Sequence, residues 1–172
     1  MLLLLFLSIV VNGPTGVSAH SQKTPQLIQN LVFGEVVERL LAGGEQHSYA
    51  FTLEAGQYGR IAVEQHAVEV VMTLFDEDGR SLIEVDSAGK ETASVIAAQK
   101  TTIRVIVRAR QQEGAGGTYL IRMEEHRTAV PEDQVRINAE RLTAEGALLS
   151  AKAAKDSLQT HRRNSSKACS GC

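Results

Sequence analysis

The residues best suited to bind a metal are Asp76 and Asp78, which precede Gly79. Alternating carboxylates in a loop are typical calcium ligands, but an EF-hand loop would need another oxygen ligand where this chain has Arg80. We favour a tight turn, in which Gly79 takes a positive φ and Asp76 binds the amides ahead of it. A surface calcium site that adds Asp86 from the adjacent strand is the alternative, and we expect no other metal site.

The histidines and cysteines offer little further chemistry. None of the histidines stands at metal-ligand spacing from another, and exposed strand faces explain His47 and His66 better than an approach across paired strands. Cys169 and Cys172 form a CxxC, but a redox motif needs a helix N-terminus in a βαβ unit. A local disulfide, or a tail without a role, is the favoured interpretation. The histidines are His20, His47, His66, His126 and His161.

No catalytic constellation is evident among the serines and acids. Ser48, Ser81 and Ser94 lack the strand-turn-helix setting of an exposed nucleophile. The pair Glu124-Glu125 lies at a strand end and is expected to face solvent. The sequence therefore predicts a protein that is not an enzyme and that binds no cofactor.

Composition narrows the class of protein. The chain has 172 residues, 43% of them hydrophobic and 22% charged, which is typical of a globular domain with appendages. Its formal net charge is −2, and no basic stripe is present, so there is no electrostatic reason to expect nucleic acid as a partner.

The N-terminal run MLLLLFLSIVV has the length of a signal-peptide core and is too short to span a bilayer. Residues 12–14 (Asn-Gly-Pro) interrupt it, and residues 17–19 (Val-Ser-Ala) offer small side chains to a signal peptidase. No Lys or Arg precedes the run. We predict that residues 1–19 are a signal peptide cleaved after Ala19; a short anchor that stays attached is the alternative. The chain would then be periplasmic, cell-surface or secreted in a bacterium, without membrane contact after cleavage.

Alternation of apolar and polar residues predicts an all-β domain over residues 31–126, after a polar linker at residues 20–30. Short strands with Gly- or Asp-bearing turns indicate an antiparallel β-sandwich or jelly roll of seven to eight strands. Residues 31–41 suit a first strand interrupted at Gly34, or a short helix, and we favour the strand. The other predicted strands are Ser48–Leu53, Arg60–Gln65, Val68–Phe75, Ser81–Val85, Thr92–Ala98, Thr102–Ala109 and Thr118–Glu124.

A long amphipathic helix is predicted over residues 131–158. Pro131 suits the first turn, and Glu132 and Asp133 suit the positive end of the helix dipole. An apolar stripe recurs at helical spacing and needs a partner, so we expect the helix to pack on another helix. Residues 159–172 are predicted to be disordered. The stripe consists of Val135, Ala139, Leu142, Leu149 and Ala153, with Gly146 in the same row.

Several short strings carry a resemblance to a known family. The chain resembles, over residues 31–158, the N-terminal module of exported bacterial proteins that continue into tetratricopeptide repeats and a CHAT (caspase-like) peptidase domain. That module is similar to the pre-peptidase C-terminal family, which implies a jelly-roll sandwich followed by a helix that leads into repeats. The strings are Gly43–Tyr49 (GGEQHSY), Phe51–Tyr58 (FTLEAGQY), Val63–Gln65, Val70–Phe75, Asp78–Gly79, Val85–Ser87, Gly117–Tyr119 and Glu140–Arg141.

The function that these observations favour is that of an exported, non-catalytic accessory module that makes protein or polysaccharide contacts. Tyr58 is the candidate for stacking on sugars, although a place at the rim of the core suits it better. Because no repeats or peptidase segment follow residue 158, a truncated or frame-shifted TPR/CHAT-type peptidase is one alternative. The other is a structural spacer whose helix docks or dimerises.

Overall fold

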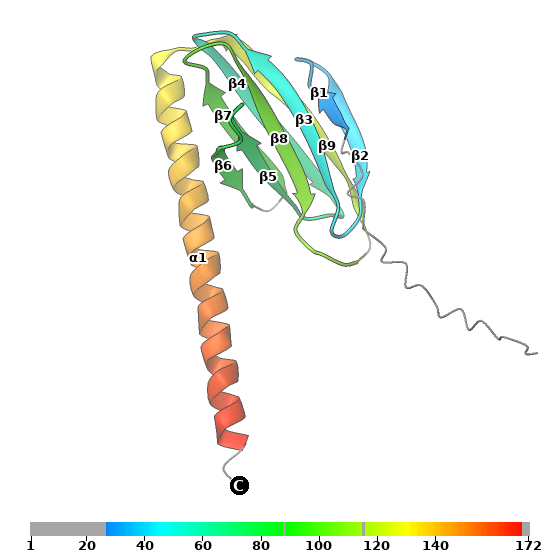
Figure 1. Ribbon diagram of the computed structural model, residues 1–172, viewed down its shortest axis with the longest axis vertical. Helices are drawn as coiled ribbons and strands as arrows, with labels where there is room; N and C mark the ends of the chain where they lie inside the picture. Colours follow the sequence, from blue (N-terminus) through cyan, green and yellow to red (C-terminus); the bar gives the residue numbers. More distant parts are fainter. Residues whose placement is uncertain (1–26, 88, 115, 170–172) are drawn as a thin grey trace, which may run out of the picture.

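The structure is a computed structural model that describes residues 27–87, 89–114 and 116–169 (Figure 1). Within these residues nine strands are followed by one helix, which confirms the predicted sandwich and C-terminal helix but adds to the seven or eight strands expected. The elements are β1 (Ile28–Asn30), β2 (Val36–Leu41), β3 (Gln46–Leu53), β4 (Gln57–His66), β5 (Val70–Phe75), β6 (Ser81–Val85), β7 (Lys90–Ile96), β8 (Thr101–Ala109), β9 (Gly117–Thr128) and α1 (Pro131–Cys169).

The strands form two sheets that enclose one core. The five-stranded sheet has the order β1-β3-β8-β5-β6, and the four-stranded sheet has the order β2-β9-β4-β7. Strands β1 and β2 therefore each form an edge, one in each sheet. All pairings between these strands are antiparallel except that of β1, which runs parallel to β3.

The first strand departs from the prediction. Residues 28–30, the end of the predicted linker, form β1, which places Ile28 opposite Ser48. Three residues are too few to show an alternating pattern, so this strand could not be predicted from local periodicity. The chain then turns at Gly34, whose φ is 85°, and regular pairing resumes only at Val36. The favoured strand is thus confirmed over residues 36–41, while residues 31–35 form only an isolated bridge from Phe33 to Met123. The helix alternative is wrong.

Alternation along the strands was a reliable guide to the core. Strand β8 buries Ile103, Val105 and Val107, as predicted, and β5 is buried along nearly its whole length between β8 and β6. Each such aliphatic side chain contributes about 1.5–3 kcal/mol by leaving water. The other inward residues that alternation predicted, and that are buried, are Tyr49, Phe51, Leu53, Ile61, Val63, Tyr119, Ile121 and Met123.

The helix α1 begins as predicted but ends later. The Asp133 carboxylate accepts a hydrogen bond from the Val130 amide at 2.8 Å, and the Asp133 amide returns one to the Val130 carbonyl at 3.0 Å. The helix then continues to Cys169, through most of the segment predicted to be disordered. No Gly or Pro lies between residues 147 and 169 to end it, and polar residues alone do not break a helix.

Only the first turns of α1 lie against the sandwich, beside β6 and β7, and the remainder extends past it (Figure 1). Over residues 131–159 its buried side chains are Asp133 and Ala144, while Glu140 is half-buried. Within the described ranges, no helix has the length and apolarity needed to cross a membrane.

Candidate functional site

Exposed apolar side chains gather where the chain enters the sandwich. We call this surface the β1–β2 edge, because it is carried by the two edge strands and the residues beside them. The exposed fraction of its side chains runs from 51% to 89%. Figure 1 shows β1 and β2 side by side. The Arg39 guanidinium of β2 donates a hydrogen bond to Gln29 Oε1 of β1 at 2.6 Å. The residues of the β1–β2 edge are Leu27, Ile28, Val32, Phe33, Val36 and Leu40.

The pattern of β2 explains why these side chains are exposed. Val37 packs against the core and Leu41 is buried in it, while Val36 and Leu40 point to the opposite side of the strand. Among the described strands, β2 is paired only with β9, so the described chain leaves the backbone amides and carbonyls on its other side unpaired. An apolar face beside an unpaired edge can receive an added strand or pack on an apolar surface of another protein.

Aromatic residues are mostly covered. In the described part of the chain only Phe33 is an exposed aromatic residue, at 54%, and its ring meets that of His126 edge-on with centroids 6.3 Å apart. Tyr58, the residue considered for sugar stacking, is fully buried. The Arg127 guanidinium lies 4.5 Å from the Tyr58 ring centroid, and the Tyr58 hydroxyl is 2.8 Å from Ser94 Oγ. Tyr58 therefore helps to seat α1 and is not available to a ligand.

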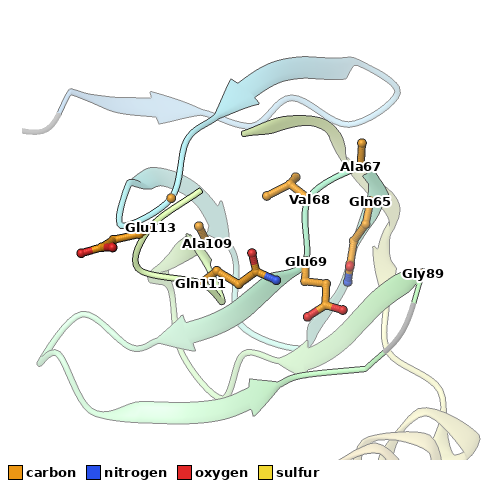
Figure 2. Close-up of a pocket in the computed structure, with 9 residues that line it drawn as sticks. Gln65, Ala67, Val68, Glu69, Gly89, Ala109, Gln111 and Glu113 are labelled. Carbon is orange, nitrogen blue, oxygen red and sulfur yellow. The ribbon is translucent and has the colours of Figure 1, made fainter. Parts of the chain in front are cut away.

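A pocket of about 390 Å³ lies at the loop end of the sandwich (Figure 2). The turn between β4 and β5 forms one wall, where Ala67 holds a φ of 63°. In Figure 2 the Gln111 amide reaches toward Glu69, and Glu113 points away from both. The described lining residues include no Ser, Cys or His, and this pocket offers hydrogen bonds and the negative charge of two glutamates. They are Gly43, Gln65, Ala67, Val68, Glu69, Gly89, Ala109, Gln111 and Glu113.

Two glutamates have raised pKa values, and both belong to internal networks. Burial raises the pKa of Glu91, whose carboxylate accepts hydrogen bonds from Ser87 Oγ at 2.7 Å, the Ser87 amide at 2.8 Å and Gln65 Nε2 at 2.7 Å. Burial likewise raises the pKa of Glu140, which accepts a hydrogen bond from Ser94 Oγ at 3.1 Å. Raised pKa values can mark catalytic acids, but these two carboxylates hold a loop and a helix in place.

His47 and His66, both expected on exposed strand faces, differ in their exposure to solvent. His66 is exposed as predicted, but His47 is half-buried on the inner side of β3, which corrects its predicted exposed position. Its Nδ1 lies 2.8 Å from the Tyr119 hydroxyl, and that hydroxyl is 2.6 Å from the Tyr49 hydroxyl. Burial lowers the pKa of His47 and raises that of Tyr119, so this chain of polar groups is uncharged at neutral pH.

The calcium alternative is not supported by the positions of its residues. Asp76 Oδ1 accepts a hydrogen bond from the Arg80 amide at 2.8 Å, and Gly79 has a φ of 79°, as expected for the tight turn. Asp86 follows the far end of β6, roughly 16 Å along the strand from that turn. Among the residues that the structure describes, no group of three or more potential ligands could hold a metal ion.

Some predicted site residues lie outside the described part of the chain. Cys172 is among them, so the disulfide with Cys169 stays a prediction. The same holds for His20 and for the side chain of His161.

Comparison with known proteins gives similarity to solved structures only. No protein-family model matches the sequence, and no curated protein matches it. The pre-peptidase C-terminal domain of a collagenase from Bacillus anthracis is 12% identical, with a TM-score of 0.46, over 58% of this chain and 97% of that domain. PliG of Aeromonas hydrophila, a periplasmic inhibitor of g-type lysozyme, is 11% identical, with a TM-score of 0.42, over 56% of this chain and 97% of PliG.

Proposed function

We propose that this chain is an exported, non-catalytic binding module that makes protein contacts through the β1–β2 edge. The observation that carries the proposal is the set of exposed, large apolar side chains on two adjacent edge strands. Large apolar side chains left exposed near one another favour an interaction site, because leaving them in water is unfavourable. The unpaired side of β2 adds backbone hydrogen bonds for an incoming strand.

Protein is favoured over polysaccharide by the chemistry of this surface. Apart from Phe33, the side chains of the β1–β2 edge are aliphatic and offer no flat ring to a sugar. The polar pocket in Figure 2 lies at the loop end of the sandwich, beyond β2, and could add contacts to an amide or a positive charge. Export itself rests on the apolar N-terminal segment, and the TPR/CHAT context rests on the sequence resemblance; both are part of the proposal.

A binding screen with matched variants tests the proposed function. The exported chain is screened against a displayed peptide library and a panel of polysaccharides, with folding checked by circular dichroism. Leu40→Lys places a charge in the β1–β2 edge and should abolish peptide binding. Leu82→Lys makes the same change at an exposed position, 40% accessible, on the edge strand β6, and should leave binding intact.

Two outcomes would contradict this proposal. A well-folded chain that binds only polysaccharides would assign the surface to another class of ligand. Equal peptide binding by Leu40→Lys and Leu82→Lys would move the site away from the β1–β2 edge.

A further inference from the structure

The helix α1 contacts the sandwich through one face only. Asp133 and Ala144 are 2% and 8% exposed, and Glu140 binds Ser94 of β7. These residues recur at intervals of seven and four, so they occupy one side of the helix. The other side of the helix is left without a partner within the described chain.

That other side carries a regular row of large apolar residues. Val135, Leu142 and Leu149 are 70%, 64% and 68% exposed and are spaced by seven residues, which is close to two helical turns. Four residues after each of them stands a small residue, which lies on nearly the same side. These are Ala139, Gly146 and Ala153. We call the six residues together the α1 stripe.

The α1 stripe is complementary to itself in one orientation. When two copies of α1 run antiparallel with Ala144 at the centre of the pair, Leu142 of each copy lies level with the partner's Gly146. Val135 then lies level with the partner's Ala153, and Leu149 with the partner's Ala139. A side chain built on Gly146 would meet nothing within 4 Å, so this position is open to receive the leucine. A parallel pair would instead place large residues against each other and leave gaps at the small ones.

The flank of the stripe is compatible with the same pairing. Arg141 Nε and Glu145 Oε1 of one copy are 4.0 Å apart. In the antiparallel pair Glu145 lies about two residues, or roughly 3 Å along the axis, from the level of the partner's Arg141. Glu145 of each copy therefore lies near Arg141 of its own helix and close to the level of Arg141 of the partner helix. Each sandwich packs on the face of its helix that carries Asp133 and Ala144. Of the stripe residues, Ala139 also borders a pocket between α1 and β6, at the edge of the contact.

We propose that the occupant of the α1 stripe is a second copy of this chain, bound antiparallel through α1. The contact uses a surface separate from the β1–β2 edge, so it goes beyond the proposed function. The overlap of residues 131–157 is about 40 Å long and about 10 Å wide, or about 400 Å² per copy. This is about half of a standard interface, so the dimer is reversible and depends on concentration.

Sedimentation velocity with stripe variants tests the dimer. The chain is expressed in full, purified from the exported fraction and kept reduced, so that its cysteines do not link copies. The wild type should pass from monomer to dimer as concentration rises. Leu142→Glu should weaken the dimer more than about tenfold, whereas Gln134→Glu, an exposed position off the stripe, should not.

A second variant separates loss of the dimer from loss of folding. Gly146→Leu fills the position that receives the partner's leucine and should also abolish the dimer. Because leucine is a better helix former than glycine, the helix content of the monomer should be unchanged or higher. Circular dichroism measures this on the same samples.

Cysteine cross-linking checks the orientation. In a background where Cys169 and Cys172 are serine, a mixture of Leu142→Cys and Gly146→Cys chains should cross-link between the two variants. Faster cross-linking of Leu142→Cys with itself would indicate a parallel pair and overturn the proposal.

Three further results would also overturn it. They are a wild type that stays monomeric at every concentration, a Gly146→Leu chain that dimerises normally, and a monomer that binds an added amphipathic peptide through the stripe. If Leu40→Lys abolished the dimer, the chain would self-associate through the β1–β2 edge and not through α1. That result would overturn the α1 dimer without contradicting the proposed function of the β1–β2 edge.

Discussion

Gly117, the first residue of β9, stands where two parts of the backbone nearly touch. A Cβ at this position would lie 2.5 Å from both the Ala67 carbonyl carbon and the His66 oxygen. The sequence indicates Gly-bearing turns between strands, but it could not show this contact, because the other partner lies about 50 residues earlier in the chain.

We expect Gly117→Ala to destabilise the sandwich by about 1–3 kcal/mol, because the added methyl group must displace backbone atoms. Urea unfolding measures the change. Gly146→Ala is the matched control, since its methyl group meets nothing and alanine favours the helix. A Gly117→Ala chain as stable as wild type would show that β9 can shift away from the β4–β5 turn.

Glu91 makes the stability of the fold depend on pH. Burial raises the pKa of Glu91 in the folded chain above the ordinary 4.5. The contribution of Glu91 to folding stability is therefore complete below pH 4.5 and is lost as the pH rises through the folded pKa. Glu91→Gln keeps an acceptor for the Ser87 amide and Gln65, and it removes the buried charge. The stability of the variant relative to wild type should therefore increase from pH 4 to pH 8.

Urea unfolding of both proteins at several pH values measures this difference, and Glu77→Gln serves as a control at an exposed position. A constant difference across that range would exclude the buried charge as its cause. The sequence did not predict this network. Glu91 lies just before the predicted strand Thr92–Ala98, and its partner Gln65 is distant in the chain, so nothing local distinguished it from an exposed acid.

At the scale of elements, α1 is held by a charged anchor at its first turn. The Arg127 guanidinium binds both oxygens of Asp133, at 2.6 and 2.8 Å, and the same arginine covers the ring of Tyr58. This pairing lowers the pKa of Asp133 to about 2. The contribution of the Arg127–Asp133 pair to folding stability is complete above the ordinary pKa of 3.8, and it is lost as the pH falls through about 2.

We expect Asp133→Asn to loosen the base of α1, because the asparagine cannot neutralise Arg127. Amide hydrogen exchange in the first turns of the helix should become faster, while exchange in the strands stays unchanged. Glu132→Gln is the control, since Glu132 is an exposed acid in the same turn. Equal exchange in the two variants would mean that the helix dipole, and not the Arg127 contact, secures the helix.

The elements that the sequence predicted well are those with a clear period. Strand β8 alternates along its whole length, and the start of α1 carries both a proline and acids. The apolar stripe of α1 was also found, but the sequence did not show that the sandwich takes the opposite face. That face is chosen by polar contacts such as Glu140 with Ser94, whose partners are 46 residues apart.

At the scale of the whole molecule, the sequence predicted two packed layers but not which strands form their edges. Strand order depends on pairings between distant segments, such as β2 with β9, and local patterns do not encode them. The β1–β2 edge was missed for this reason. The strand favoured for residues 31–41 did not show which way Val36 and Leu40 point, and only the order of the sheet shows that they face outward at an edge.

The molecule consists of a well-packed sandwich and a helix whose second half extends past it (Figure 1). Every residue from Glu145 to Gln159 is exposed, whereas the first turns of α1 are anchored. In dilute solution we therefore expect amides 145–159 to exchange hydrogen much faster than those of residues 131–144. Mass spectrometry of peptides from exchanged samples measures both segments at once.

Raising the concentration should slow the exchange of amides 145–153 in the wild type, because antiparallel pairing covers this part of the α1 stripe. Leu142→Glu should remove that dependence and leave the strands unaffected. Strong protection of this segment at the lowest concentration, in both chains, would mean that the chain itself covers the second half of α1. The helix would then be part of a single folded unit and would not be a docking element.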